Sequence, residues 1–163
     1  MTLQEPDRLW LLTTIAAYPA QYRAELVGVP EAALRWKPSE REWSLAEVMA
    51  HLADTEEEYV TRRVLPILRE DRPAIAGFDQ DAWAVERRYN DQDPMENLAR
   101  FARWNAELVR ILWTLEDADW QRVGIHSERG PVTLAELVAT LARHHASHLH
   151  QMRRVKLQYL SRA

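Results

Sequence analysis

Residues 43–54 of the 163-residue chain read WSLAEVMAHLAD, and this stretch decides the fold prediction. Ser44 and Glu47 have the spacing of a capping box, in which a serine side chain and a glutamate three residues later satisfy free N–H groups at the start of a helix. Apolar residues then recur every three or four positions, as they do along one face of an α-helix. We therefore predict a helix from 44 to about 68, with Pro66 distorting its last turn.

A second helix start of the same kind lies near the C-terminus, where residues 132–137 read VTLAEL. Thr133 and Glu136 have the spacing of its capping box. The apolar positions that follow predict a helix from 133 to about 160.

Two further segments, near 6–26 and 94–115, show the same helical periodicity. Pro19 is expected to kink or end the first of them, because proline lacks the N–H group that a helix interior needs. Four helices joined by short and medium connections predict an all-α protein with a four-helix bundle. A glycine-bounded connection at 122–131 can hold some extended structure, but we expect no sheet of three or more strands.

Residues 70–93 form the least regular stretch, with aspartates, prolines and a glycine scattered through it. A connection of this length is uncommon in a compact domain, and such connections often carry function. We expect a long loop between the second and third helices.

The composition is that of a folded protein, with 47% apolar and 28% charged residues, and its length predicts a single domain over 1–163. A net charge of −4 argues against a nucleic-acid binder or a binder of anionic membranes. No apolar run approaches the roughly 20 residues of a membrane span, and the acidic start at Glu5 and Asp7 is unlike a signal peptide. We expect a cytoplasmic protein with no nucleic-acid and no membrane partner.

The chain has no cysteine, which excludes a disulfide framework, a thiolate zinc site and a cysteine nucleophile. Five of the six histidines fall on the two helices that begin with capping boxes. His144 and His148 are four residues apart, so they lie on one face of the last helix and could bind the same ion. His145 and His148, three residues apart, also share a face, so the spacing leaves the ligand pair open.

The histidines of the last helix continue its apolar seam, and His51 flanks the apolar stripe of the helix from 44 to 68. A buried imidazole needs partners for its ring nitrogens, and three histidines would leave a metal ion open to water or substrate. Two other interpretations remain. One is a surface cluster near a helix C-terminus, and the other is a set of core histidines held by hydrogen bonds.

Three segments carry a resemblance to a known family: residues 43–54, residues 130–137 and residues 144–148, which read HHASH. In this order and spacing they resemble the DinB/YfiT-like superfamily of metal-binding four-helix bundles. The resemblance covers nearly the whole chain. It implies the same fold as the helical periodicity does.

The resemblance also implies a set of metal ligands. Carried over to this chain, the family's triad is His51, His144 and His148, with His145 as a neighbour. Some members have a carboxylate two residues after the second histidine of the HxxxH pair, where this chain has His150. An acidic helper is therefore missing at that position.

The activity that the resemblance implies is broad. Members of the family resemble metal-dependent hydrolases, or S-transferases and isomerases that use a low-molecular-weight thiol such as bacillithiol, mycothiol or glutathione. We expect such an enzyme, acting on a small molecule through a divalent ion, with zinc or nickel favoured. The alternative is a non-catalytic stress-response module that binds a metal or a small ligand on the same bundle. A third interpretation, a helical scaffold for a partner protein, predicts no metal.

Two acidic residues near His51 are candidate helpers. Asp54, three residues on, could orient the ring, and Glu58, about two turns on, could act as a base or as an acceptor behind the ligand. The acidic run at 56–58 is otherwise expected on a solvated face.

Aromatic residues suggest two further features. Trp43 and Trp83 lie next to loops and are expected to line the mouth of a pocket. The first and third helices carry aromatic residues that we expect to be exposed, because they are more than a small core needs, and this together with the resemblance favours a homodimer. These residues are Trp10, Tyr18, Trp104 and Trp113.

Overall fold

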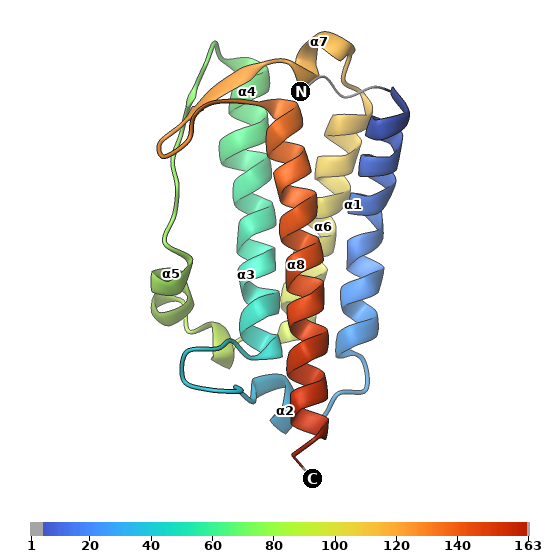
Figure 1. Ribbon diagram of the computed structural model, residues 1–163, viewed down its shortest axis with the longest axis vertical. Helices are drawn as coiled ribbons and strands as arrows, with labels where there is room; N and C mark the ends of the chain where they lie inside the picture. The colour runs from blue at the N-terminus through green and yellow to red at the C-terminus, as the bar shows by residue number, and fades with distance from the viewer. Residues whose placement is uncertain (1–4, 163) are drawn as a thin grey trace.

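The computed structural model describes residues 5–162, so the ends of the domain predicted over 1–163 lie outside it. Four long helical segments form a bundle (Figure 1). They are α1 (Glu5–Leu26), α3 (Leu45–Tyr59) with its continuation through η1 (Val60–Val64) and α4 (Leu65–Arg69), α6 (Pro94–Trp113) and α8 (Leu134–Leu160). Within the described range, every helix is too short or too polar to span a bilayer. The prediction of an all-α four-helix bundle is confirmed.

The directions of the helices explain the long connection at 70–93. In Figure 1, α1 and α8 run from the top of the bundle to the bottom, whereas α3 and α6 both run upwards. The two parallel helices α3 and α6 pack side by side, so the chain must return along the whole bundle between them. A long crossover connection of this kind is one of the established ways to join a four-helix bundle. The length of this connection therefore follows from the topology.

This connection is more regular than predicted. It contains β1 (Ala74–Ile75), α5 (Gln80–Glu86) and the short 3-10 turn η2 (Tyr89–Asp91). Asp79 begins α5, and its carboxylate accepts hydrogen bonds from the N–H groups of Asp81 and Ala82. The expectation of a loop was wrong here, because one capping aspartate looks like the other scattered aspartates in the sequence.

A small sheet closes the top of the bundle. β2 (Val123–His126) and β3 (Gly130–Thr133) form an antiparallel hairpin, and β1 pairs with β2 in parallel. The expectation that no three-stranded sheet would form was wrong, although the strands have only two, four and four residues. Gly124 permits the close approach, because a Cβ at this position would lie 2.4 Å from Ile75 Cδ1. The sheet thus ties the long connection to the segment before α8.

Both predicted helix starts are present. Ser44 Oγ accepts a hydrogen bond from the N–H of Glu47, whose carboxylate accepts one from the N–H of Ser44. Thr133 and Glu136 repeat this arrangement at the start of α8. Two short helices, α2 (Glu31–Arg35) and α7 (Asp117–Trp120), lie in the connections. The two helices that carry the histidines therefore begin where the sequence predicts.

Pro19 neither ends α1 nor interrupts it, since the helix is continuous to Leu26. Proline has no N–H for the carbonyl four residues earlier, which belongs to Ile15. Asn105 Nδ2 on α6 donates to this carbonyl instead, at 3.2 Å. A side chain from a neighbouring helix thus replaces the missing backbone bond.

The distortion expected from Pro66 is a π turn. The N–H of Leu65 bonds the carbonyl of Val60, five residues earlier, so the helix widens just before the proline. The helix then continues through α4 to Arg69. The turn therefore changes the direction in which residues after Tyr59 face.

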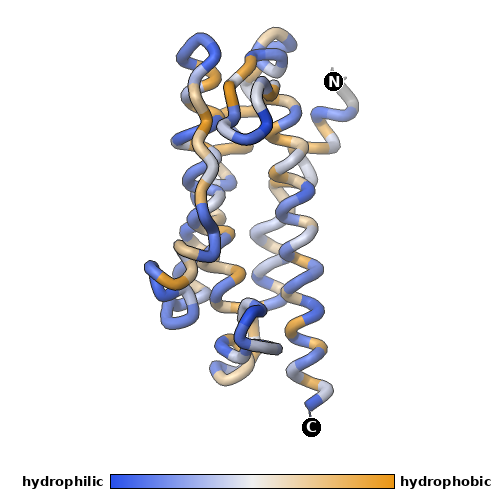
Figure 2. Tube along the Cα trace, turned by 60° about the vertical axis from the view of Figure 1, so that its left-hand side comes forward, coloured by the Kyte–Doolittle hydropathy of each residue, from blue (hydrophilic) through white to orange (hydrophobic). Residues whose placement is uncertain are grey.

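Two large clusters of apolar side chains fill the described part of the bundle, one towards each end, and a polar layer lies between them. Figure 2 shows orange and blue alternating along the helices, as expected where one face of each helix is buried. The polar layer consists of Glu56, Asn105 and His145, from α3, α6 and α8. Glu56 was predicted on a solvated face, but it is fully buried. The prediction for this residue was wrong because successive residues of a helix point in different directions. Glu56 lies on the face of α3 that packs inside the bundle, whereas the two glutamates after it face outwards.

The aromatic residues of α1 and α6 divide into two groups. The rings of Trp10 and Trp113 are 67% and 62% exposed. Trp104 is half-buried against the upper core, and Tyr18 is buried, with its hydroxyl donating to the carbonyl of Ala142. The prediction that all four are exposed was therefore wrong for Tyr18.

Candidate metal centre

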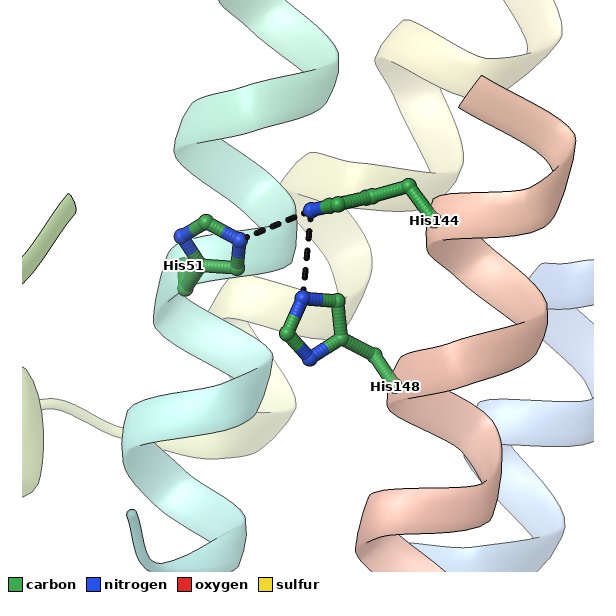
Figure 3. Close-up of side chains that lie close together, drawn as sticks. All are labelled: His51, His144 and His148. Carbon is green, nitrogen blue, oxygen red and sulfur yellow. Dashed lines mark hydrogen bonds between the residues drawn. The ribbon is translucent and has the colours of Figure 1, made fainter. Parts of the chain in front are cut away.

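Three histidines from two antiparallel helices meet between α3 and α8 (Figure 3). His51 Nε2 lies 3.0 Å from His144 Nε2, which in turn lies 3.1 Å from His148 Nε2. All three of these ligand atoms lie within 4.8 Å of one another. Helix geometry accounts for the pair on α8, because residues four apart project from one face, one above the other. The structure therefore brings together the three histidines that the resemblance selected.

These imidazoles are neutral at pH 7. Burial, helped by the nearby His148 and His145, lowers the pKa of His51 to about 3. Burial first, and the neighbouring histidines second, hold the pKa of His144 far below its ordinary value. Burial also lowers the pKa of His148. A metal ion binds the neutral form of imidazole, so all three rings are in the state that binding requires.

Gln151 fixes the orientation of one ring. Its Oε1 lies 2.7 Å from His148 Nδ1, so Nδ1 carries the proton and donates to the amide oxygen. The neutral ring then has its lone pair on Nε2, the atom that faces His144. Metal-binding histidines commonly have a partner of this kind on the other ring nitrogen. The sequence reasoning missed Gln151, although its spacing of three residues from His148 placed it on the same face.

The site is buried on one side and accessible on the other. His51 is 1% exposed, whereas His144 and His148 are half-buried. The Trp43 ring lies 4.9 Å from the His51 ring and stacks on the His148 ring at 6.2 Å. Trp43 also lines a surface cavity of about 520 Å³. It therefore lies between the histidines and a cavity, which agrees with the expectation for this residue.

The donor set and its spacing fit a divalent ion of the zinc type. Zinc–imidazole bonds of 2.0–2.1 Å in a tetrahedral arrangement place neighbouring nitrogens roughly 3.3 Å apart. Two of the three separations between the nitrogens are 3.0 and 3.1 Å, and all lie within 4.8 Å, so small shifts of the rings would place them around an ion. Imidazole nitrogen suits zinc, nickel, copper and iron alike.

His145 follows His144 in the chain but lies elsewhere. Its Nε2 is 3.0 Å from Glu56 Oε2, and both side chains are 0% exposed. The two atoms are as close as those of an ion pair, but the N–H of the ring does not point directly at the oxygen, so the contact is not a hydrogen bond. Asn105 Nδ2 donates to the other carboxylate oxygen of Glu56 at 3.0 Å. His145 therefore belongs to the polar layer of the core, and its Nε2 faces a carboxylate.

The two candidate helpers have other partners. Asp54 accepts hydrogen bonds from Arg87 at 2.5 Å, from the Tyr89 hydroxyl at 2.6 Å and from Arg100. These contacts tie the end of the long connection to α3 and α6. Within residues 5–162, none of the hydrogen bonds of Asp54 goes to His51.

Glu58, the other candidate, pairs with Arg62 at 3.2 Å on the outside of α3. Trp83, expected at a pocket mouth, stacks on Phe78 at 4.5 Å, with the Arg87 guanidinium 3.6 Å above its ring. These side chains pack the long connection against the bundle.

A family model described as the DinB superfamily matches residues 15–152, which include all three histidines. The chain belongs to the DinB superfamily. The chain shares its fold with the solved structure of YfiT from Bacillus subtilis. That protein is described as "a probable metal-dependent hydrolase with an unusual four-helix bundle topology". The two agree with a TM-score of 0.89 over 96% of this chain and 90% of that one, at 21% identity.

Several relatives of this DinB-superfamily chain carry the name "Putative metal-dependent hydrolase". YfiT of Bacillus subtilis is 28% identical over 69% of this chain and 65% of its own length. A protein of Oceanobacillus iheyensis is 27% identical over 68% of this chain and 62% of its own length. A protein of Geobacillus thermodenitrificans is 24% identical over 93% of this chain and 86% of its own length. The match thus spans less than two thirds of the first two relatives.

Proposed function

We propose that this chain is a metal-dependent enzyme acting on a small molecule, with His51, His144 and His148 holding one divalent ion. The observation that carries the proposal is the convergence of three neutral imidazole nitrogens, within 4.8 Å of one another, at a site that is only half-buried on its α8 side. Three protein ligands leave at least one coordination position for water or substrate. The names of the relatives, which refer to metal-dependent hydrolases, support the same class of activity.

The finer proposal is hydrolysis, or the transfer of a low-molecular-weight thiol, with zinc or nickel as the ion. Such an ion lowers the pKa of a bound water or thiol and so supplies hydroxide or thiolate at neutral pH. The chain has no cysteine of its own, so a thiolate nucleophile must come from a small molecule. Gln151 keeps His148 in the binding tautomer, and Trp43 shields one side of the histidines.

Neither Asp54 nor Glu58 is free to act as a general base in this arrangement. Asp54 is engaged by two arginines and a tyrosine, and Glu58 by Arg62. Neither carboxylate is therefore placed to take a proton from a water or thiol that the three histidines and their ion would hold.

The proposal is tested by metal analysis combined with two assays. The purified protein is loaded with zinc or nickel, and its metal content is measured. It is then assayed for hydrolysis of ester and amide substrates, and for consumption of several thiols with an electrophilic acceptor. We expect one of the two activities, lost on chelation and restored by the metal. A bound metal with neither activity would favour the non-catalytic module instead.

We also propose that the protein is a homodimer that acts in the cytoplasm. Trp10 on α1 and Trp113 on α6 are 67% and 62% exposed, at the same end of two helices that pack side by side. Large aromatic side chains exposed together are typical of an interface. Sedimentation at micromolar concentration should give a dimer, and Trp10→Glu should give a monomer. A monomeric wild-type chain would remove this proposal.

A further inference from the structure

Arg63 is a buried cation without an acidic partner. It lies in the π turn η1 and is 8% exposed. Across residues 5–162 it forms no ion pair with any carboxylate, whereas its neighbour Arg62 pairs with Glu58 at 3.2 Å and Arg87 pairs with Asp54 at 2.5 Å. Charged side chains are rarely buried without a counter-charge, because losing hydration costs free energy. Arg63 thus differs from Arg62 and Arg87, each of which has a carboxylate partner.

Aromatic rings hold the Arg63 guanidinium in place. It lies 4.6 Å from the centre of the Tyr59 ring and 5.5 Å from the centre of the Phe78 ring. A cation over an aromatic ring is stabilised, but a ring occupies none of the five N–H donors of the guanidinium in the way a carboxylate does. The planar group is therefore positioned and still able to donate hydrogen bonds.

Arg63 lies above the metal centre on the same helix. His51, Thr55 and Tyr59 follow one another at intervals of four along α3, and Arg63 is the next residue in this series. In a regular α-helix the series would drift around the axis, but the π turn holds more residues per turn and brings Arg63 back towards the face of Tyr59. Arg63 thus lies above the metal centre, towards the face of α3 that carries His51 and Tyr59.

We propose that Arg63 binds the carboxylate of the small molecule on which the metal centre acts. A guanidinium offers two parallel N–H groups that match the two oxygens of a carboxylate, and hydrogen bonds between charged groups are the strong ones. The ion would bind the reacting end of the molecule, and Arg63 would bind its anionic end. Wide π turns within helices are frequent at functional sites, which agrees with this placement. The inference rests on the proposed metal-dependent function and adds the substrate class to it.

The test uses matched pairs of thiols on the cobalt-substituted protein. The pairs are mercaptoacetate, 3-mercaptopropionate and 4-mercaptobutyrate, each compared with its neutral amide. Binding of sulfur to cobalt is followed by the change in the absorption spectrum. We expect at least one carboxylate to bind about 10-fold more tightly than its amide, the size of one charge-assisted hydrogen bond. In Arg63→Met this preference should disappear, with cobalt content and amide affinity unchanged.

The matched control is Arg62→Met, which removes the adjacent, exposed arginine of the same turn and should keep the preference. Wild-type protein that does not prefer any of the three carboxylates would overturn the proposal, as would a preference that survives in Arg63→Met. The melting temperature gives an independent reading. Removing an unpaired buried charge should leave it unchanged or raise it, whereas a large fall would identify Arg63 as a packing residue and would count against the proposal.

A last arm separates this inference from the metal-dependent function. Butyrate and butyramide are titrated against the metal-free wild type and Arg63→Met, and binding is followed by NMR. Butyrate binding that needs Arg63 supports the anion site even if no ion binds to the histidines. Equal binding of butyrate to the two proteins overturns it even if the metal centre and its activity are established.

Discussion

His144 and His145 are adjacent in the chain, yet they belong to two regions of opposite character at the same level of the bundle. His144 lies in the half-buried site between α3 and α8, where its Nε2 is within 3.1 Å of two other imidazole nitrogens. His145 lies in the closed polar layer of the core, where its Nε2 is 3.0 Å from the carboxylate of Glu56. Successive residues on a helix point about 100° apart, so one step along α8 separates the two environments.

The comparison shows which features distinguish a binding site from a structural polar layer. In the polar layer the histidine faces a carboxylate, and both oxygens of that carboxylate have a neighbour. In the metal site like groups converge, and burial keeps them neutral. With the protons on the other ring nitrogens, three imidazole lone pairs in this arrangement would suit a cation. The polar layer has a structural use as well, since Asn105 also bonds the carbonyl that Pro19 leaves free.

The largest effect is expected from His148→Ala. It removes one of three protein ligands, so the affinity for zinc or nickel should fall by about 1000-fold or more, equivalent to about 4 kcal/mol. Competition with a chromogenic chelator measures the affinity. His150→Ala is the matched control, because His150 is exposed on the same helix, and it should bind metal as the wild type does. An equal loss of metal affinity in the two variants would show that His148 is not a specific ligand.

The next effect concerns the polar layer. Glu56→Ala leaves His145 and Asn105 without their buried partner, so the free energy of unfolding should fall by about 3 kcal/mol, while the number of bound metal ions stays the same. Urea denaturation and metal analysis give the two quantities. The control is Glu57→Ala, because Glu57 is the next residue and is partly exposed. This change should alter the free energy of unfolding by less than about 0.5 kcal/mol. Loss of metal from Glu56→Ala would mean that the two regions are one site.

The third effect is the dependence of stability on pH in the metal-free protein. The pKa of His51 is about 3 in the folded chain and near 6.5 when unfolded. Below pH 6.5 the unfolded state takes up a proton that the folded state does not, so stability is full above pH 6.5 and is lost as the pH falls towards 3. From His51 alone, about 2 kcal/mol should be lost by pH 5. Denaturation of wild type and His51→Gln at pH 7 and pH 5 measures this, and the variant should lose less. Identical losses would show that His51 is not held neutral by the fold.

The smallest effect is expected from Gln151→Leu. Without the acceptor on Nδ1, His148 can adopt either tautomer, and metal affinity should fall about 10-fold. Gln158→Leu, at an exposed position of the same helix, should have no effect. The chelator competition used for His148→Ala resolves a change of this size. An unchanged affinity would remove Gln151 from the site but leave the three ligands in place.

The four helices, and the placement of the histidines on two of them, could be predicted from the sequence, because both depend on local patterns. The capping boxes at Ser44 and Thr133 mark where two helices begin. The helical period then predicts which face of its helix each histidine occupies. The choice between His144 and His145, however, depended on the family resemblance. Spacing alone allows either residue to pair with His148, and only the packing of α8 against α3 decides between them.

The features that could not be predicted depend on contacts between distant segments. Glu56 looks like part of a solvated acidic run until α6 and α8 bury it beside Asn105 and His145. Arg63 looks like Arg62 until the π turn and the two aromatic rings cover it. The three-stranded sheet forms because Ala74 and Ile75 pair with a hairpin about 50 residues further along the chain. No local sequence pattern predicts this pairing.

The most direct test of the metal site is the zinc content of two variants at adjacent residues, His144→Ala and His145→Ala, which are purified in parallel and loaded with one equivalent of zinc. Elemental analysis after gel filtration gives the number of ions per chain. We expect close to one ion in His145→Ala and close to none in His144→Ala, because the imidazole of His144, unlike that of His145, points at His51 and His148. Zinc retained in His144→Ala and lost from His145→Ala would show that His145, and not His144, binds the ion with His51 and His148.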